Sequence, residues 1–276
     1  MRIDGHTRII PHIGYPTHSF KAPLIYNPFF EHRGVNALVV PMACQAGDFE
    51  PLLRSLFRLG NTVGALITMP HKVRATQCVD ELSPAASIAG ACNAVRLGPQ
   101  GQLQGDLFDG EGFVRGILRK GLVLSGKRAL VVGCGGVGSA IAASLAQAGV
   151  AGLGLFDLRA PSAQSLGERL QRHYPLLQVE VGHRDPAGFE LVVNATPLGM
   201  SEGDPLPVDV ARLSPQTFVG EVVMREEITA FLAAARQRGC AIQVGSDMLF
   251  EQIPAYLEYF DLPSGTPEEL RALARL

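Results

Sequence analysis

The chain has 276 residues, of which 47% are hydrophobic and 18% charged, and its formal net charge is −2. This balance excludes intrinsic disorder and fits a globular protein long enough for two domains. The near-neutral charge excludes a strongly basic surface for nucleic acid or anionic membranes. Apolar runs stay below the roughly 18–20 residues that span a bilayer, and the polar start lacks a signal-peptide core, so we expect a cytoplasmic protein.

The cysteines are odd in number and form no C-x-x-C pair. This usage disfavours a disulfide framework or a zinc site, and we expect no metal. Buried free thiols in a reducing compartment are predicted instead. The five are Cys44, Cys78, Cys92, Cys134 and Cys240.

The first part of the chain alternates strand-like apolar segments with helical ones, which indicates an α/β domain over residues 1–112. The helical segments within residues 247–276 are expected to complete this domain. Predicted strands cover residues 38–40 and 65–68, and predicted helices cover residues 51–59, 73–80, 253–260 and 267–276.

A βαβ unit follows in the middle of the chain. Residues 129–132 are typical of a buried strand, the glycine-rich turn 133–138 comes next, and residues 139–148 are predicted to be a helix. A second strand over residues 153–156 ends at Asp157. Further strands (177–181, 191–193, 218–219) and helices (163–173, 228–238) alternate beyond it. Residues 113–246 are therefore predicted to form a doubly wound parallel sheet of the Rossmann type that binds NAD(P).

The turn matches the dinucleotide-binding pattern G-x-G-x-x-G. The pattern also occurs in tight turns that bind nothing, but here it follows a strand and opens a helix, as the motif requires. Glycines let the backbone approach a pyrophosphate, and the helix N-terminus supplies amide groups and partial positive charge. We therefore predict cofactor contacts at Gly133, Gly135, Gly136, Val137 and Gly138.

Asp157 stands where an acidic residue accepts hydrogen bonds from the adenosine ribose. A carboxylate there repels a 2′-phosphate, so NAD is predicted as the cofactor. Arg159 lies close enough to hold a phosphate, which keeps NADP as an alternative. Asp157 also has the simpler interpretation of an N-cap for the following helix.

Five further segments have unusual composition, and in order and spacing they resemble the shikimate dehydrogenase family over nearly the whole chain. Two of them, T-x-P-x-K and N-A-T-P-L-G-M, are specific to that family. The resemblance implies an enzyme that transfers a hydride between shikimate, quinate or a closely related cyclic hydroxy acid and a nicotinamide cofactor. The segments are T-M-P-H-K at 68–72, G-A-C-N at 90–93, D-G-E-G-F at 109–113, N-A-T-P-L-G-M at 194–200 and G-S-D-M-L-F-E-Q at 245–252.

The resemblance implies that Lys72 is the catalytic lysine and that Asp109 is its carboxylate partner. Oxidation of a secondary alcohol needs a group that accepts the hydroxyl proton as the hydride leaves, and a lysine oriented by a carboxylate suits this role. From these two residues alone, an ordinary ion pair is the simpler interpretation. We expect both residues to belong to the first domain and to face a nicotinamide ring that the second domain holds.

Further matches imply contacts with substrate and cofactor. Thr68, Asn93 and Gln252 match substrate-binding positions, although a strand-end cap and a helix-face amide are alternatives for Thr68 and Gln252. The matches near the nicotinamide end are Asn194, Thr196, Met200, Gly245 and Met248, of which the two methionines suit a core equally well.

The family usually grips the substrate carboxylate with two serines, in the pattern G-x-P-x-x-H-S-x-S-P. Here residues 14–23 read G-Y-P-T-H-S-F-K-A-P. Aligned without a gap, Phe20 and Ala22 replace both serines; with a slip of one residue, Ser19 survives and only the second serine is lost. Each lost bond weakens binding by about 1–3 kcal/mol, so we expect a modified substrate preference with preserved hydride chemistry.

Members of the family that use NADP carry N-R-T-x-x-R at the end of the second cofactor strand. The matching positions here are Asp157, Leu158, Arg159 and Ser162, so both usual arginines are absent, which again favours NAD.

The predicted partner is a small-molecule substrate, and the protein is expected to be a monomer or a homodimer. Two alternatives for its function stay open. One is a family member that acts on a different or amino-substituted shikimate analogue. The other is a non-catalytic NAD-binding protein of the same fold, which would have no need to keep both Lys72 and Asp109.

Overall fold

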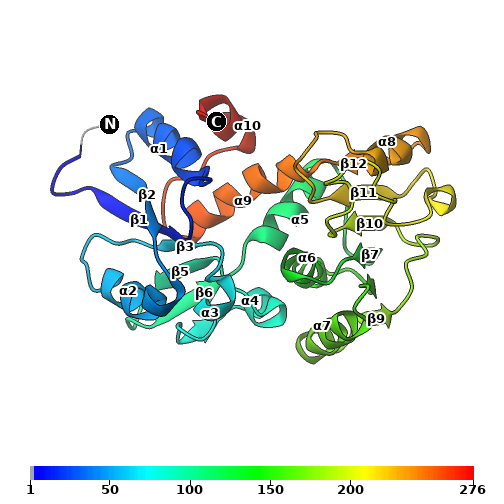
Figure 1. Ribbon diagram of the computed structural model, residues 1–276, viewed down its shortest axis with the longest axis horizontal. Helices are drawn as coiled ribbons and strands as arrows, with labels where there is room; N and C mark the ends of the chain where they lie inside the picture. The colour runs from blue at the N-terminus through cyan, green and yellow to red at the C-terminus, as the bar shows by residue number, and fades with distance from the viewer. Residues whose placement is uncertain (1–2) are drawn as a thin grey trace. The chain divides into compact units, whose positions relative to one another are not determined.

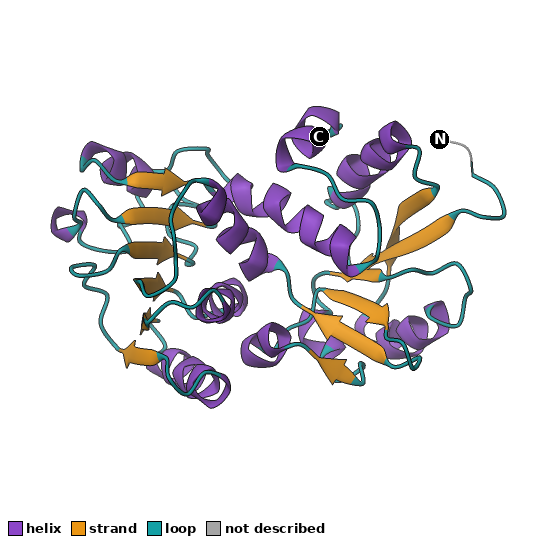
Figure 2. Cartoon of the chain, turned by 180° about the vertical axis from the view of Figure 1, so that it is seen from behind, coloured by secondary structure: helices purple, strands orange, loops and turns teal. Residues whose placement is uncertain are grey.

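A computed structural model describes residues 3–276 of the chain; residues 1 and 2, which begin the predicted first domain, lie outside it. The chain divides into two compact units, each with a six-stranded sheet (Figures 1 and 2). The first unit runs to Phe108 and includes Ile253–Leu276, and the second is Asp109–Gln252. Across the described residues, no helix combines the length and apolar character needed to cross a membrane.

The sheet of the first unit is mixed. Its strand order is β2-β1-β3-β5-β6-β4, in which β1 is parallel to both neighbours and β5 is antiparallel to both. The register places His12 of β1 opposite Pro41 on one side and Leu66 on the other. The strands are β1 (Arg8–Gly14), β2 (Ala37–Ala43), β3 (Ala65–Ile67), β4 (Glu81–Leu82), β5 (Ala94–Leu97) and β6 (Leu103–Asp106).

Helices cover this sheet, and one core cluster joins the sheet residues Ile13 and Ile67 to the fully buried Phe49 and Leu53. The C-terminal segment belongs to the same unit because Phe260 fills the space beside Gly64 and the Tyr259 hydroxyl donates to the carbonyl of Gln104 (2.8 Å). The helices are α1 (Ala22–Arg33), α2 (Phe49–Leu56), α3 (Lys72–Ala75), α4 (Pro84–Ala89) and α10 (Pro267–Leu273), with a 3₁₀ turn at Ala46–Asp48.

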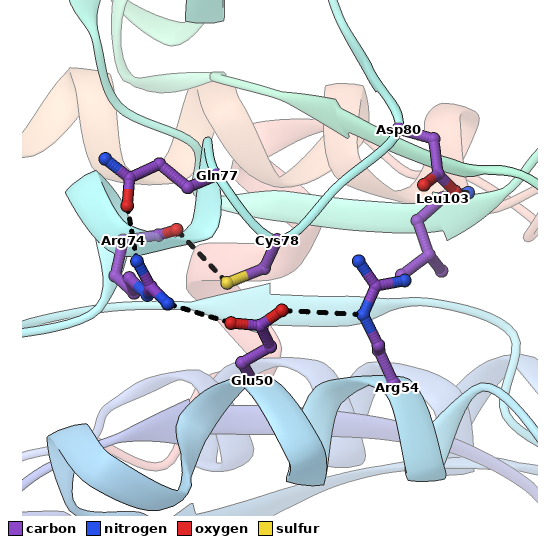
Figure 3. A network of polar contacts seen from close by, with 7 residues as sticks. All are labelled: Glu50, Arg54, Arg74, Gln77, Cys78, Asp80 and Leu103. Carbon is purple, nitrogen blue, oxygen red and sulfur yellow. Dashed lines mark hydrogen bonds and ion pairs between the residues drawn. The ribbon is translucent and has the colours of Figure 1, made fainter.

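The prediction of a helix over residues 73–80 is wrong in extent, because α3 ends at Ala75. The Thr76 hydroxyl donates to the carbonyl of Val73 (2.8 Å), and the Cys78 thiol donates to that of Arg74 (3.3 Å). Such side-chain bonds compete with the helical pattern. Glu50 of α2 accepts from Arg74 at 2.8 Å and ties the two helices together (Figure 3).

The second unit has a fully parallel sheet in the order β12-β11-β10-β7-β8-β9, which is the 3-2-1-4-5-6 arrangement of the Rossmann fold. The predicted fold class is therefore confirmed. The strands are β7 (Arg128–Val132), β8 (Gly152–Phe156), β9 (Gln178–Val181), β10 (Leu191–Asn194), β11 (Phe218–Glu221) and β12 (Ala241–Gln243). The helices are α6 (Gly136–Gln147), α7 (Ala160–His173) and α8 (Ala230–Gln237), with a 3₁₀ turn at Val210–Arg212.

Two more helices, α5 (Asp109–Arg119) and α9 (Gly245–Tyr259), mark the ends of the second unit. Sequence patterning did not predict α5, because its glycines disfavour a helix. They serve close packing instead: a Cβ on Gly110 would lie 2.1 Å from the carbonyl oxygen of Ala140 in α6, and one on Gly112 would lie 2.6 Å from that of Met248 in α9.

The five cysteines are all buried as free thiols, as their number and spacing predict. They lie in both units and make only weak sulfur contacts, such as that from Cys92 to the carbonyl of Ala94 (3.1 Å). Burial raises the pKa of each thiol, so the thiolate form that drives oxidation and metal binding is disfavoured.

Candidate active site

A cavity of about 1130 Å³ opens in the second unit at the carboxyl ends of its parallel strands. Val132, Phe156, Thr196 and Val222 line it, and each ends or closely follows a strand. The strand order reverses between β7 and β10, and open α/β sheets bind ligands at this kind of reversal. The cavity therefore lies where the fold favours a dinucleotide.

The glycines of the turn have two roles: one lets the turn close tightly, and two leave open space for a ligand. A Cβ on Gly138 would lie 1.9 Å from the carbonyl oxygen of Gly133, so the turn closes tightly on itself. Gly135 and Gly136 line the cavity, and no protein atom lies within 4 Å of where their Cβ atoms would be. This open space, at the first residues of α6, fits a pyrophosphate.

Asp157 lines the same cavity and braces the glycine turn. Its carboxylate, whose side chain is 13% exposed, accepts the backbone N–H of Cys134 (2.8 Å) and that of Arg159 (2.8 Å). Leu158 and Arg159 also line the cavity with largely exposed side chains. The bracing contact with Cys134 joins neighbouring strand ends, and no local sequence pattern predicts it.

Two arginines of the cavity were missed by sequence reasoning. Arg184, in the loop after β9, lines the cavity with its guanidinium 5.5 Å from the centre of the Phe156 ring. Arg225 also lines it and donates to the carbonyl of Met200 (2.9 Å). Together with Arg159 they make the lining positive, which suits phosphate groups. Their loops carry no motif, so the sequence holds no signal for them.

The segment 194–200 is held by a buried network. The Asn194 side chain donates to the carbonyl of Leu198 (3.0 Å) and accepts from both the N–H (3.1 Å) and the hydroxyl (2.6 Å) of Thr196. Glu221 is fully buried and accepts from the Thr229 hydroxyl (2.8 Å); burial raises the pKa of its carboxyl. Asn194 therefore shapes the loop.

The predicted cofactor residues separate into two groups. One group lines the cavity. The other group, also among the described residues, is buried and does not line the cavity. The lining group is Gly133, Gly135, Gly136, Val137, Asp157, Leu158, Arg159, Thr196 and Met200, and the buried group is Gly138, Asn194, Gly245 and Met248.

In the first unit, Asn93 joins the segments that carry the predicted catalytic pair. Its side-chain oxygen accepts the N–H of Phe108 (3.0 Å), the residue before Asp109. Its neighbour Cys92 donates a backbone N–H to the carbonyl of Lys72 (2.8 Å). Lys72 begins α3, and Asp109 begins α5 as the first residue of the second unit. Asn93 is 1% exposed, and its Nδ2 is buried without a hydrogen-bond partner.

Phe20 occupies the space beside Thr68. A Cβ on Gly14 would lie 2.5 Å from the methyl group of Thr68 and 2.8 Å from the ring of Phe20, so these groups crowd one point. Ser19 is exposed, and Ala22 begins α1. Gln252 ends the second unit, and its Oε1 is buried without a hydrogen-bond partner in residues 3–276.

The ring of His12 on β1 lies against the Phe20 ring, tilted by 30° with the ring centres 4.1 Å apart. Its Nδ1 is buried and has no hydrogen-bond partner within the described part of the chain. Burial, and to a smaller extent the positive charge of Lys72, lowers the pKa of His12 to about 4. The imidazole is therefore uncharged at neutral pH.

Comparisons with known proteins agree with this geometry. The family model of the shikimate dehydrogenase substrate binding domain matches residues 12–95, and that of the ThiF family matches residues 118–178. A shikimate dehydrogenase (NADP(+)) of Rubrobacter xylanophilus is 37% identical over 258 residues, which cover 91% of this chain and 89% of the relative. A shikimate dehydrogenase (NADP(+)) of Acidiphilium cryptum is 33% identical, and the match covers 99% of this chain and 98% of the relative.

Solved structures are similar over the same extent. Shikimate 5-dehydrogenase of Listeria monocytogenes, in complex with shikimate and NAD, has a TM-score of 0.91 at 25% identity and covers 99% of this chain and 98% of its own. Quinate dehydrogenase of Corynebacterium glutamicum, in complex with NAD, has a TM-score of 0.82 at 27% identity, with coverage of 97% and 98%. The similarity therefore includes both units.

The glycine turn generates a paired prediction. Gly135→Ala should fold like the wild type, because its backbone (φ −73°, ψ −168°) suits any residue, yet it should bind NADH roughly tenfold more weakly. Gly138→Ala should lose about 1–3 kcal/mol of stability through its clash. Urea unfolding and NADH fluorescence titration measure both effects. Wild-type NADH affinity in Gly135→Ala would contradict the cofactor site.

His12 generates a prediction about pH. The unfolded chain binds a proton on this residue below pH 6.5, whereas the folded chain does so only near pH 4, so stability falls as the pH drops between these values. From pH 7 to pH 5, the free energy of unfolding of the wild type should fall by about 2 kcal/mol more than that of His12→Phe. Urea denaturation at both pH values tests this, and an equal fall in the two proteins would refute it.

Proposed function

Because the chain belongs to the shikimate dehydrogenase family, we propose that it catalyses the family's hydride transfer with Lys72 and Asp109 as the catalytic pair. The reaction interconverts shikimate, or a closely related cyclic hydroxy acid such as quinate, with its ketone. A nicotinamide dinucleotide accepts the hydride in one direction and donates it in the other. The observation that carries the proposal is the hydrogen-bonded cluster of Asn93, which holds the backbone of Lys72 and the residue before Asp109 in one place.

The proton of the reacting hydroxyl passes to the amine of Lys72. Asp109 orients this amine and balances its charge as the proton arrives. Asp109 is only 8% exposed, so little water competes for its carboxylate. When bound, the oxidised nicotinamide supplies the hydride acceptor. In the reverse direction Lys72 returns the proton to the oxygen of the ketone.

The substrate hydroxyls are bound by amides and a hydroxyl. The Nδ2 of Asn93 and the Oε1 of Gln252 are buried polar atoms with no hydrogen-bond partner among the described residues, and buried polar atoms in proteins are usually paired. A hydroxyl group both donates and accepts, so it can accept from an amide N–H or donate to an amide oxygen. Thr68, the residue directly after β3, adds a third polar group beside Phe20.

The preferred cofactor is NAD, with Asp157 as the selecting residue. Its carboxylate is fixed in the cavity by two backbone N–H groups, so it cannot turn away from a 2′-phosphate without breaking them. The guanidinium of Arg159 is 78% exposed and is screened by solvent, so it compensates only weakly. The five buried thiols support a reducing, cytoplasmic location for the enzyme.

Substitution of the catalytic pair should abolish most turnover. Lys72→Met and Asp109→Asn should each lower kcat for shikimate or quinate oxidation by about 10²–10⁴-fold, the usual contribution of general acid–base catalysis. Arg74→Met is the matched control, because Arg74 lies in the same helix but pairs with Glu50 at the surface. Steady-state formation of NADH measures the rates. A Lys72→Met enzyme within tenfold of the wild type would refute the assignment.

Cofactor choice should depend on the charge of Asp157. Asp157→Asn keeps an acceptor for the Cys134 N–H but removes the negative charge, so the preference for NAD over NADP should fall about tenfold. The ratio of kcat/KM for the two cofactors is the measurement, since it cancels any loss common to both. Arg159→Ser, as a control, should weaken NADP more than NAD. A wild-type enzyme that uses NADP as well as NAD contradicts the proposal.

A further inference from the structure

We propose that His12 is a substrate-binding residue that determines specificity, with its imidazole hydrogen-bonded to one ring hydroxyl of the substrate and held in place by Phe20. This inference rests on the proposed function and adds a residue to its substrate site. His12 lies on β1, between β2 and β3, and neither its sequence surroundings nor any motif singled it out.

The ring of His12 is fixed close to the proposed chemistry. Its plane is tilted by 30° from that of Phe20, with the ring centres 4.1 Å apart, and Phe20 and Thr68 both lie beside Gly14. Lys72 is near enough for its charge to act on the imidazole. His12 therefore lies against Phe20 in the first unit, in the neighbourhood of Thr68 and Lys72.

A second histidine of this unit, His71, packs on an aromatic ring and also has a hydrogen-bond partner for its imidazole. His71 stacks on Phe49 with ring centres 4.4 Å apart, and its Nε2 bonds to the carbonyl of Cys44 (2.8 Å). The ring of His12 lies against Phe20 at a tilt of 30°, and its buried Nδ1 has no partner among the described residues. A buried polar atom left in this way is destabilising, so a bound ligand is its natural partner.

The chemistry of the surroundings indicates a hydroxyl as that partner. On the adjacent strands, His12 lies opposite Pro41 and Leu66, and its ring lies against that of Phe20. These neighbours carry no charge. The charged group that acts on the imidazole is Lys72. With its pKa lowered to about 4, the imidazole presents one donor and one acceptor at neutral pH. A hydroxyl matches both, whereas a carboxylate is better matched by a cation.

The test compares wild type with His12→Phe, which keeps an aromatic ring on Phe20 and removes both nitrogens. The probes are shikimate, the two analogues that each lack one of its non-reacting ring hydroxyls, and its methyl ester. For shikimate, KM should rise about 3- to 10-fold with kcat within twofold, the expected loss of one neutral hydrogen bond. For one of the deoxy analogues, the two enzymes should have the same KM, because the hydroxyl that His12 binds is missing.

The proposal is overturned if His12→Phe leaves the KM for shikimate unchanged, or if it raises the KM for every probe by the same factor. It is also overturned if the rise in KM is absent only for the methyl ester. This last result would assign His12 to the carboxylate. His71→Phe is the matched control and should lower stability without changing the ratios of KM among the probes.

A measurement without turnover separates this inference from the proposed function. Shikimate added to the NADH-bound enzyme should shift the ¹⁵N resonances of the His12 ring and leave those of His71 unchanged. Shikimate binding and turnover without a shift at His12 refute the inference alone. Turnover that persists in Lys72→Met refutes the proposed function, whatever His12 does.

Discussion

One buried amide, that of Asn93, connects the parts of the first unit on which the proposed chemistry depends. Its oxygen accepts the N–H of Phe108, its backbone N–H donates to the carbonyl of Asp106 (2.9 Å), and the neighbouring N–H of Cys92 binds the carbonyl of Lys72. Loss of this oxygen would leave a buried N–H unpaired, which costs about 1–3 kcal/mol. The side chain of Asn93 thus fixes the segment before Asp109 through its oxygen, while its Nδ2 stays available for the proposed contact with substrate.

The second unit separates the residues that hold its loops from the residues that meet a ligand. Asp157 braces the glycine turn, and Asn194, with Glu221 beside it, shapes the segment that follows β10. These polar side chains satisfy backbone groups that would otherwise be unpaired beside the cavity. The open surface is then formed by Gly135, by Gly136 and by arginines from separate loops. A polar residue in a family motif is therefore as often a support for the site as a contact within it.

The sequence predicts those features whose cause is local. The βαβ unit around the glycine turn has strand, turn and helix signals in unbroken order, and the structure confirms it. Helix α5 was missed because its glycines oppose helix formation, and only the close approach of Ala140 and Met248 explains them. Arg184 lies over the ring of Phe156 and His12 lies against the ring of Phe20, and no motif in the sequence predicts either contact.

The charges of the cavity bear on the proposed choice of NAD, because the curated relatives at 37% and 33% identity are named for NADP(+). The cavity holds three arginines and one carboxylate, so a count of charges alone favours a phosphate. Position changes that balance. The side chain of Asp157 is 13% exposed and accepts two backbone N–H groups, whereas that of Arg159 is 78% exposed, so water and ions screen the cation far more than the anion. A poorly solvated charge in the lining of the cavity acts more strongly on its neighbourhood than a solvated one, and this is the basis of the proposed preference for NAD.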